Sequence, residues 1–180
     1  LDKAVMKELP PLKLDKVRFE TAVETRAIEE GGADGIDRVV LQVATNPGSA
    51  AGSLIKIASG GELSRILLAL KVVLAKDIAV PTLVFDEVDK GIGGATADAV
   101  GERLQKLGDE AQVLVVTHSP QVAARGRAHF QISKSGKKET TTEVITLDAK
   151  ARREELARML SGASVSDEAR AAADQLLDAG

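Results

Sequence analysis

The 180-residue chain lacks cysteine, tryptophan and tyrosine, and three phenylalanines are its only aromatic residues. The absence of cysteine excludes a disulfide scaffold, a thiol nucleophile and a cysteine-ligated metal, and it suits a reducing cytoplasm. So few aromatic side chains imply an aliphatic core and nearly exclude stacking platforms for single-stranded nucleic acid. No apolar run approaches the roughly 20 residues that cross a bilayer, and no secretory signal is visible. We therefore expect a cytoplasmic protein that makes no contact with a membrane.

The charges are nearly balanced, with 24 basic and 27 acidic side chains and a formal net charge of -3. Hydrophobic residues make up 44% of the chain, so a disordered tail is excluded, and the length suits one domain or two small lobes. The chain begins at Leu1, and the charged, helix-prone stretch Leu1–Leu9 runs directly into Pro10 and Pro11. This beginning looks like a cut end, which indicates a piece of a longer protein.

Hydrophobic periodicity and turn residues predict the order of the elements. The predicted elements, in chain order, are a hairpin of strands Val17–Thr25 and Arg38–Ala44 around the turn Glu29–Gly35, a loop over Asn46–Ser53, a helix over Gly60–Lys76, a strand over Thr82–Phe85, a helix over Ala95–Leu107, a strand over Val113–Val116, a short helix after Ser119-Pro120, paired strands over His129–Ser133 and Thr141–Leu147, and helices over Lys150–Leu160 and Ser166–Leu177. The pattern predicts an α/β fold with mainly parallel core strands flanked by helices, and with antiparallel hairpins at the periphery. Both central strands are apolar throughout, which is typical of strands buried on both faces.

Two adjacent carboxylates follow the strand Thr82–Phe85. Asp86 and Glu87 stand at its carboxyl end, the edge at which open α/β sheets bind ligands. An apolar strand ending in Asp-Glu is the Walker B arrangement, in which the aspartate holds Mg²⁺ on a nucleotide and the next carboxylate orients or deprotonates water. The alternative is a strand that simply becomes polar where it reaches solvent.

Two further features have both a structural and a functional interpretation. His118 ends the second apolar strand, so it should lie beside Asp86 and Glu87 and could touch a terminal phosphate; otherwise it is a surface histidine. Ser59-Gly60-Gly61-Glu62 is a capping box that starts a helix. Its two glycines would also let backbone amides approach an anion.

In combination, the three features resemble the C-terminal lobe of an ABC-type ATPase head, with Ala58–Glu62 as the signature motif, Thr82–Glu87 as Walker B, Asp89 in the D-loop and His118 as the switch histidine. Within that superfamily the sequence resembles the RecN family of bacterial, SMC-like proteins that repair DNA double-strand breaks. The resemblance is carried by Ser59–Arg65, Phe85–Gly94 and Thr117–Ala124. The chain departs from the usual family pattern at Lys90, Gly93 and Ser119.

The resemblance implies an organisation in two parts. Residues 1–10 would be the remnant of a coiled-coil helix, and residues 11–180 the C-terminal lobe of the head. The sequence contains no G-x-x-x-x-G-K-[ST] motif, so a phosphate-cradling Walker A segment would come from an N-terminal lobe of the same protein. This chain alone is therefore expected to be an inactive half of an ATPase.

The resemblance also implies the role of each site residue, with ATP and Mg²⁺ as cofactors. Asp86 would bind the metal, Glu87 would activate water, and His118 would contact the γ-phosphate. Ser59, Gly60, Gly61 and Glu62 would complete the nucleotide site of a second head in a homodimer, and Asp89 would contribute a D-loop contact to the nucleotide.

Three questions stay open at this stage. Arg65 is either an interface residue or a solvated helix charge. DNA association follows from the resemblance alone, because the basic clusters Lys134–Lys138 and Arg125–Arg127 are typical of solvated faces. The alternatives are the nucleotide-binding subunit of another ABC ATPase (an SMC relative or a transporter) and a non-catalytic dimerisation module. The acidic balance and scarce aromatics disfavour a stand-alone nucleic-acid-binding module.

Overall fold

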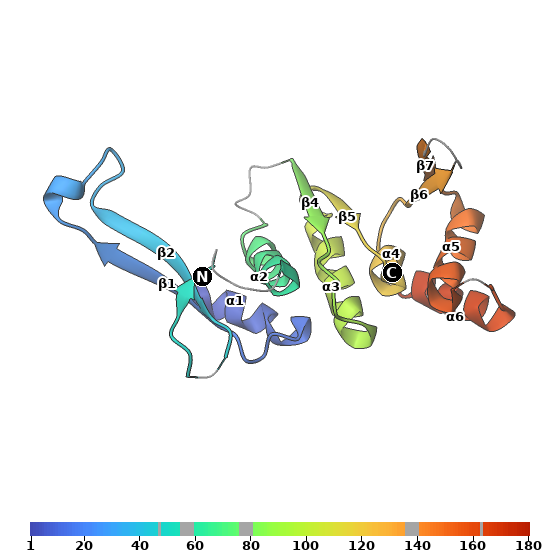
Figure 1. Cartoon of the computed structure of the whole chain (residues 1–180), viewed down its shortest axis with the longest axis horizontal. Coiled ribbons are helices and arrows are strands. Elements are labelled where there is room, and N and C mark those ends of the chain that lie inside the picture. Colours follow the sequence, from blue (N-terminus) through green and yellow to red (C-terminus); the bar gives the residue numbers. More distant parts are fainter. Residues whose placement is uncertain (47, 55–59, 76–80, 136–140, 163) are drawn as a thin grey trace.

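The computed structural model describes residues 1–46, 48–54, 60–75, 81–135, 141–162 and 164–180 (Figure 1). The helices are α1 (Asp2–Glu8), η1 (Pro10–Leu12), η2 (Ile28–Glu30), α2 (Gly60–Val73), α3 (Gly94–Leu107), α4 (Pro120–Ala124), α5 (Ala149–Ser161) and α6 (Asp167–Asp178). The strands are β1 (Arg18–Thr25), β2 (Asp37–Ala44), β3 (Gly52–Ser53), β4 (Thr82–Asp86), β5 (Gln112–Val116), β6 (Phe130–Ser135) and β7 (Thr141–Thr146). The predicted α/β order is confirmed.

Strands β1 and β2 form the predicted antiparallel hairpin, which projects from one end of the molecule (Figure 1). Its base is buried through Phe19 and Val43, whereas Val23 and Val39 nearer the tip are exposed. The prediction of a loop over the whole of Asn46–Ser53 was wrong at its end. Gly52 and Ser53 are extended and pair with β2 as β3, because the edge of β2 offers them backbone partners.

Helix α1 is part of the main core. Val5 is fully buried, and Asp2 Oδ1 accepts a hydrogen bond of 2.6 Å from Thr21 Oγ1 on β1. Glu8 forms a partly buried ion pair of 3.0 Å with Arg103 on α3. The helix therefore contacts both the hairpin and the central layer.

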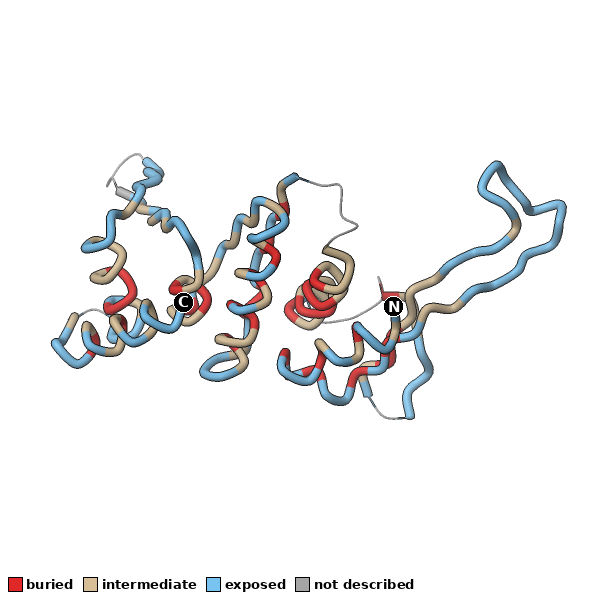
Figure 2. The backbone as a smooth tube through the Cα atoms, turned by 180° about the vertical axis from the view of Figure 1, so that it is seen from behind, coloured by how far each residue is buried: buried red, intermediate tan, exposed pale blue. Residues whose placement is uncertain are grey.

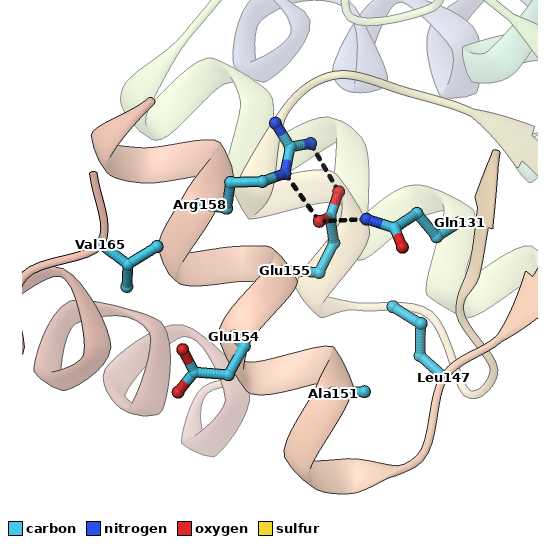
Figure 3. A pocket seen from close by; sticks show the side chains of 7 residues that line it. All are labelled: Gln131, Leu147, Ala151, Glu154, Glu155, Arg158 and Val165. Carbon is cyan, nitrogen blue, oxygen red and sulfur yellow. Dashed lines mark hydrogen bonds and ion pairs between the residues drawn. The ribbon is translucent and has the colours of Figure 1, made fainter. Parts of the chain in front are cut away.

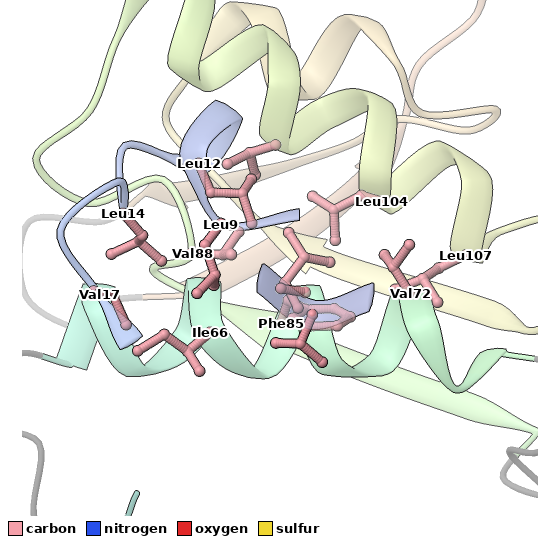
Figure 4. Close-up of a cluster of buried hydrophobic side chains, with 14 of the residues drawn as sticks. Leu9, Leu12, Leu14, Val17, Ile66, Val72, Phe85, Val88, Leu104 and Leu107 are labelled. Atoms are coloured by element: carbon pink, nitrogen blue, oxygen red, sulfur yellow. The ribbon is translucent and has the colours of Figure 1, made fainter. Parts of the chain in front are cut away.

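The main core lies around α2 and is aliphatic, as its composition predicts. Figure 4 shows Val72 of α2 beside Leu107, and Ile66, Leu9 and Phe85 are buried in the same cluster. Phe85 and Phe19 are the two aromatic residues of this cluster. Helix α2 ends at Val73, shortly before the predicted Lys76, which lies outside the described residues. A smaller cluster joins α4, α5 and α6.

Strands β4 and β5 pair in parallel, with α3 as the crossover between them. Leu83 and Phe85 are buried in the core, whereas the opposite face presents Val84 at 67%, Leu114 at 45% and Val116 at 63% exposure. Figure 2 shows buried and exposed residues side by side through the middle of the chain. The prediction that both strands are buried on both faces was wrong for this chain. The described residues supply helices to one face alone, although both faces are apolar.

Strands β6 and β7 form the predicted antiparallel pair, and α5 and α6 are the predicted terminal helices. Each helix has a side-chain cap: Asp148 accepts from the backbone N–H of Ala151, and Ser166 accepts from that of Ala169.

His129, which precedes β6, gives the stability of this end of the molecule a pH dependence. Burial, followed by the charge of Arg152 and opposed by Glu155, holds the pKa of His129 below its ordinary 6.5. Below about pH 6.5 the unfolded chain takes up a proton that the folded chain does not, so the free energy of unfolding falls as the pH drops. We expect this loss between about pH 7.5 and about pH 5.5 to be smaller in His129→Gln, measured by urea unfolding. Equal losses in both proteins would contradict the prediction.

Candidate functional site

The candidate site lies at the carboxyl edge of the β4–β5 sheet. The parallel register places Asp86 opposite Val116, so Glu87 and Thr117 leave the two strands side by side. His118 directly follows Thr117, two positions after β5 ends. Two segments about 30 residues apart in sequence thus deliver two carboxylates and an imidazole to one edge of the sheet, as parallel pairing requires.

Asp86 and Glu87 are both exposed at this edge. Glu87 has a positive φ of 53°, which a non-glycine residue adopts at some cost, and the chain turns sharply there. Its carboxylate accepts a hydrogen bond of 2.9 Å from Lys90 Nζ. That hydrogen bond, with the charges of Glu87 and Asp86, raises the pKa of Lys90. Spacing alone did not reveal this ion pair, because the two residues are joined by a turn rather than a helix.

The side chains at this edge are better suited to a magnesium ion that is also bound by nucleotide phosphates than to a metal ion whose ligands all come from the protein. No group of three or more acidic or histidine side chains in the described ranges could hold a metal ion. Mg²⁺ usually takes one or two carboxylates together with phosphate oxygens and water. The exposed carboxylate of Asp86 fits that requirement.

Asp89 lies beneath the edge and is fully buried. Its Oδ2 accepts hydrogen bonds from Thr117 Oγ1 at 2.5 Å and from the Ser119 backbone N–H at 3.1 Å. The Nδ1 atom of His118 lies 3.6 Å from the same oxygen. The carboxylate predicted to contact a nucleotide is thus directed at the loop after β5, and Thr117 is a site residue that the sequence did not single out.

The predicted signature residues lie at the start of α2. Ser59 is outside the described residues, while Gly60 is exposed, Gly61 is buried and Glu62 is half-buried. A Cβ atom on Gly61 would lie 3.2 Å from the carbonyl oxygen of Lys90, so a larger residue would have to push that carbonyl aside by a few tenths of an ångström and close packing favours glycine. A Cβ on Gly60 would meet nothing within 4 Å, so packing does not require the first glycine.

Arg65 connects the same helix to the turn after β4. Its side chain is only 6% exposed, and Nη1 donates a hydrogen bond of 3.3 Å to the Lys90 carbonyl oxygen. Burial lowers the pKa of Arg65, and the charge of Glu62 opposes this effect. Of the two interpretations left open for Arg65, the solvated helix charge was therefore wrong; the guanidinium joins the first turns of α2 to the Glu87–Lys90 turn.

The predicted basic clusters do not form an open cationic surface within the described residues. Arg125 is paired with Asp98 at 2.8 Å, and Arg127 with Asp109 at 2.5 Å. Lys134 is on β6, whereas most of Lys134–Lys138 lies outside the described residues.

A shallow pocket of about 360 Å³ lies beside α5, away from this edge (Figure 3). Glu155 in its wall accepts hydrogen bonds from Arg158 and from Gln131 Nε2. The bond from Arg158, more than any other cause, lowers the pKa of Glu155. The pocket contains none of the predicted site residues.

Comparison with known proteins relates the chain to one group of curated proteins. No family model matches it. DNA repair protein RecN of Rickettsia conorii is 47% identical over 178 residues, which cover 98% of this chain and 32% of that protein. The RecN of Xylella fastidiosa (strain Temecula1) is 54% identical over 145 residues, or 80% of this chain and 26% of that protein. The chain thus spans about a third of the length of these relatives.

Solved structures with a similar fold are SMC head domains. A head domain of Smc from Pyrococcus yayanosii matches with a TM-score of 0.61 at 17% identity, over 86% of this chain and 28% of that one. The Smc head from Pyrococcus furiosus, bound to the C-terminal domain of ScpA, matches with a TM-score of 0.59 at 17% identity, over 89% of this chain and 37% of that one. These likenesses confirm the predicted α/β fold class, since the chain folds like part of an SMC head domain.

Proposed function

Since this chain is related over nearly its whole length to about a third of DNA repair protein RecN, we propose that it forms the C-terminal lobe of a RecN-type ATPase head. In this proposal the rest of the protein supplies the Walker A lobe, and residues 1–10 continue into its coiled coil. The observation that supports it most directly is the meeting of Asp86, Glu87 and His118 at one sheet edge.

Each residue at that edge has a chemical part in hydrolysing ATP. Asp86 offers a carboxylate oxygen to the magnesium ion, Glu87 accepts a proton from the attacking water or orients it, and His118 donates a hydrogen bond to the terminal phosphate. Magnesium and the nucleotide, when bound, bring the positive charge and the phosphoryl group. Glu87 can leave Lys90 at little cost, because both side chains are 61% exposed.

The open face of the β4–β5 sheet supports the two-lobe proposal. Val84, Leu114 and Val116 present aliphatic side chains to solvent on strands whose sequences suit burial on both sides. A Walker A lobe packed on this face would cover them and bring the phosphate cradle to the same edge. The chain alone therefore has half of a nucleotide site, and we expect it to hydrolyse ATP negligibly.

The proposal includes a second head and DNA as partners. One solved structure with a similar fold, at a TM-score of 0.52 and 16% identity, belongs to the SMC ATPases, whose dimerisation is driven by ATP and whose activation is stimulated by DNA. In a dimer, the start of α2 would face the nucleotide of the other head. Exposed Gly60 would be the described residue nearest to that nucleotide. DNA contact is assigned to the full-length protein, acting at the nucleoid in the cytoplasm. No described helix has the length and apolar character needed to cross a membrane.

A mixing experiment tests the function and the trans role of α2 together. The complete protein can be made by joining this chain to the other two thirds of a RecN relative. Gly60→Asp should lower its ATP turnover at least about tenfold, because the new carboxylate repels phosphate while an acidic residue suits a helix start. Gly60→Ala, which changes no charge, should keep most of the turnover.

A variant lacking the Walker A lysine should also be inactive alone. Mixing it with Gly60→Asp in equal amounts should restore about a quarter of the wild-type turnover, since half of randomly formed dimers contain one intact composite site. Absence of recovery at every mixing ratio would contradict the trans assignment. Absence of turnover in the complete wild-type protein would contradict the proposed function.

A further inference from the structure

We propose that Asp89 is a positioning residue for His118: it fixes the loop after β5 and holds a proton on Nδ1, so that Nε2 is directed outward. The contact with phosphate rests on the proposed function, whereas the orientation of the imidazole is a property of this chain alone.

The first support is that Asp89 accepts hydrogen bonds from the residues immediately before and after His118. Asp89 Oδ2 accepts from the side chain of Thr117 at 2.5 Å and from the backbone N–H of Ser119 at 3.1 Å. Ser119 N also approaches Thr117 Oγ1 at 3.0 Å, which closes a three-membered network. A carboxylate is costly to bury without such donors, so the network and the buried position depend on each other. The residue between the two donors is therefore fixed in its backbone.

The second support is the direction of the imidazole. His118 Nδ1 lies 3.6 Å from Asp89 Oδ2, while the side chain as a whole is 76% exposed. This distance is longer than a hydrogen bond, so the contact in this structure is electrostatic. The negative charge nevertheless favours a proton on Nδ1, as carboxylates do for histidines that act through their other nitrogen. Nε2 is then free for an external acceptor.

The third support is that Asp89 connects the turn containing Glu87 to the loop containing His118. Asp89 is two positions after Glu87, in the turn closed by a hydrogen bond of 3.1 Å from Lys90 N to the Glu87 carbonyl oxygen. Because Asp89 also holds the Thr117–Ser119 loop, the turn with Glu87 and the loop with His118 are joined as one unit. The remaining oxygen, Oδ1, is buried without a partner in the part of the chain that the structure describes.

That unpaired oxygen makes Asp89→Asn an informative variant. The amide oxygen can accept from Thr117 and Ser119, and the amide nitrogen can take the place of Oδ1. The substitution therefore keeps the loop contacts and removes the charge. Asp98→Asn is the matched control, because Asp98 is a carboxylate on α3 paired with Arg125 rather than with His118.

The experiment measures the tautomer of His118 by long-range ¹H–¹⁵N NMR at about pH 8, a pH well above that at which a free imidazole takes up a proton. The chain has two histidines, and His129→Gln assigns the signals. We expect the Nδ1–H form to predominate in the wild type and in Asp98→Asn, and to fall at least about threefold relative to Nε2–H in Asp89→Asn. A folded Asp89→Asn with the wild-type tautomer ratio would overturn the proposal.

Thr117→Val provides a second measurement that keeps the charge and removes one contact. It should lower the Nδ1–H fraction less than Asp89→Asn does, and a wild-type fraction in Thr117→Val would overturn the role of the loop contact. In the complete protein, Asp89→Asn should lower kcat by about 10–100-fold with little change in KM. The NMR result needs no nucleotide, so a complete wild-type protein without ATPase activity would remove the proposed function and leave the positioning result standing.

Discussion

Replacing Glu87 by glutamine in the complete protein should lower ATP turnover by about 10²–10⁴-fold and leave ATP binding nearly unchanged. Glutamine has the size of glutamate but cannot accept the proton of the attacking water. Glu87 is the exposed carboxylate next to Asp86, in a turn where its φ is 53°. Steady-state turnover and equilibrium binding of a fluorescent ATP analogue separate the two effects.

Two controls accompany this prediction. Glu143→Gln changes an exposed glutamate on β7 and should leave turnover at the wild-type level. Lys90→Gln releases Glu87 from its exposed ion pair and should change turnover by less than about tenfold, because water screens a pair whose two side chains are both 61% exposed. If Glu87→Gln hydrolyses ATP within about twofold of the wild type, Glu87 does not act as the base.

Replacing Val84 by lysine should separate the chain from the Walker A lobe while leaving the chain itself stable. Val84 is 67% exposed here, so its substitution should change the free energy of unfolding by no more than about 0.5 kcal/mol. In the complete head, the new ammonium would be buried against an apolar lobe, at a cost of several kcal/mol. We expect association of separately expressed lobes to weaken by about 100-fold or more.

Co-purification and calorimetry of the two lobes measure this association. The matched control is Ile28→Lys, which places the same charge on an exposed aliphatic position at the tip of the β1–β2 hairpin. It should bind the Walker A lobe as the wild type does. Wild-type affinity in Val84→Lys would show that the lobe does not cover this face of the sheet.

Local periodicity was sufficient to predict most elements. Alternation predicted the β1–β2 hairpin, and helical spacing predicted α2, α3, α5 and α6 within a few residues. The exception at Gly52–Ser53 is instructive, because two residues become a strand only when an edge of β2 is available to pair with them. Sequence patterns describe a segment and not its neighbours.

The same limit explains what the sequence could and could not predict about the site. The meeting of His118 with Asp86 and Glu87 follows from parallel strands, whose carboxyl ends share an edge. The inward direction of Asp89 does not follow, because it depends on donors from a loop about 30 residues away. Arg65 is similar: charge and helix position left an interface residue and a solvated charge both open, whereas the structure buries its guanidinium against the Lys90 carbonyl oxygen.

The β4–β5 pair also has a consequence for the behaviour of the chain in solution. Within the described residues it is a sheet of two strands, so each strand has one backbone edge that no other strand occupies. Unoccupied edges bordered by aliphatic side chains are templates on which a further strand can add. A preparation of this chain by itself therefore has a built-in route to self-association through main-chain pairing. Its aggregation should depend on protein concentration, and should be suppressed by any segment that completes the sheet.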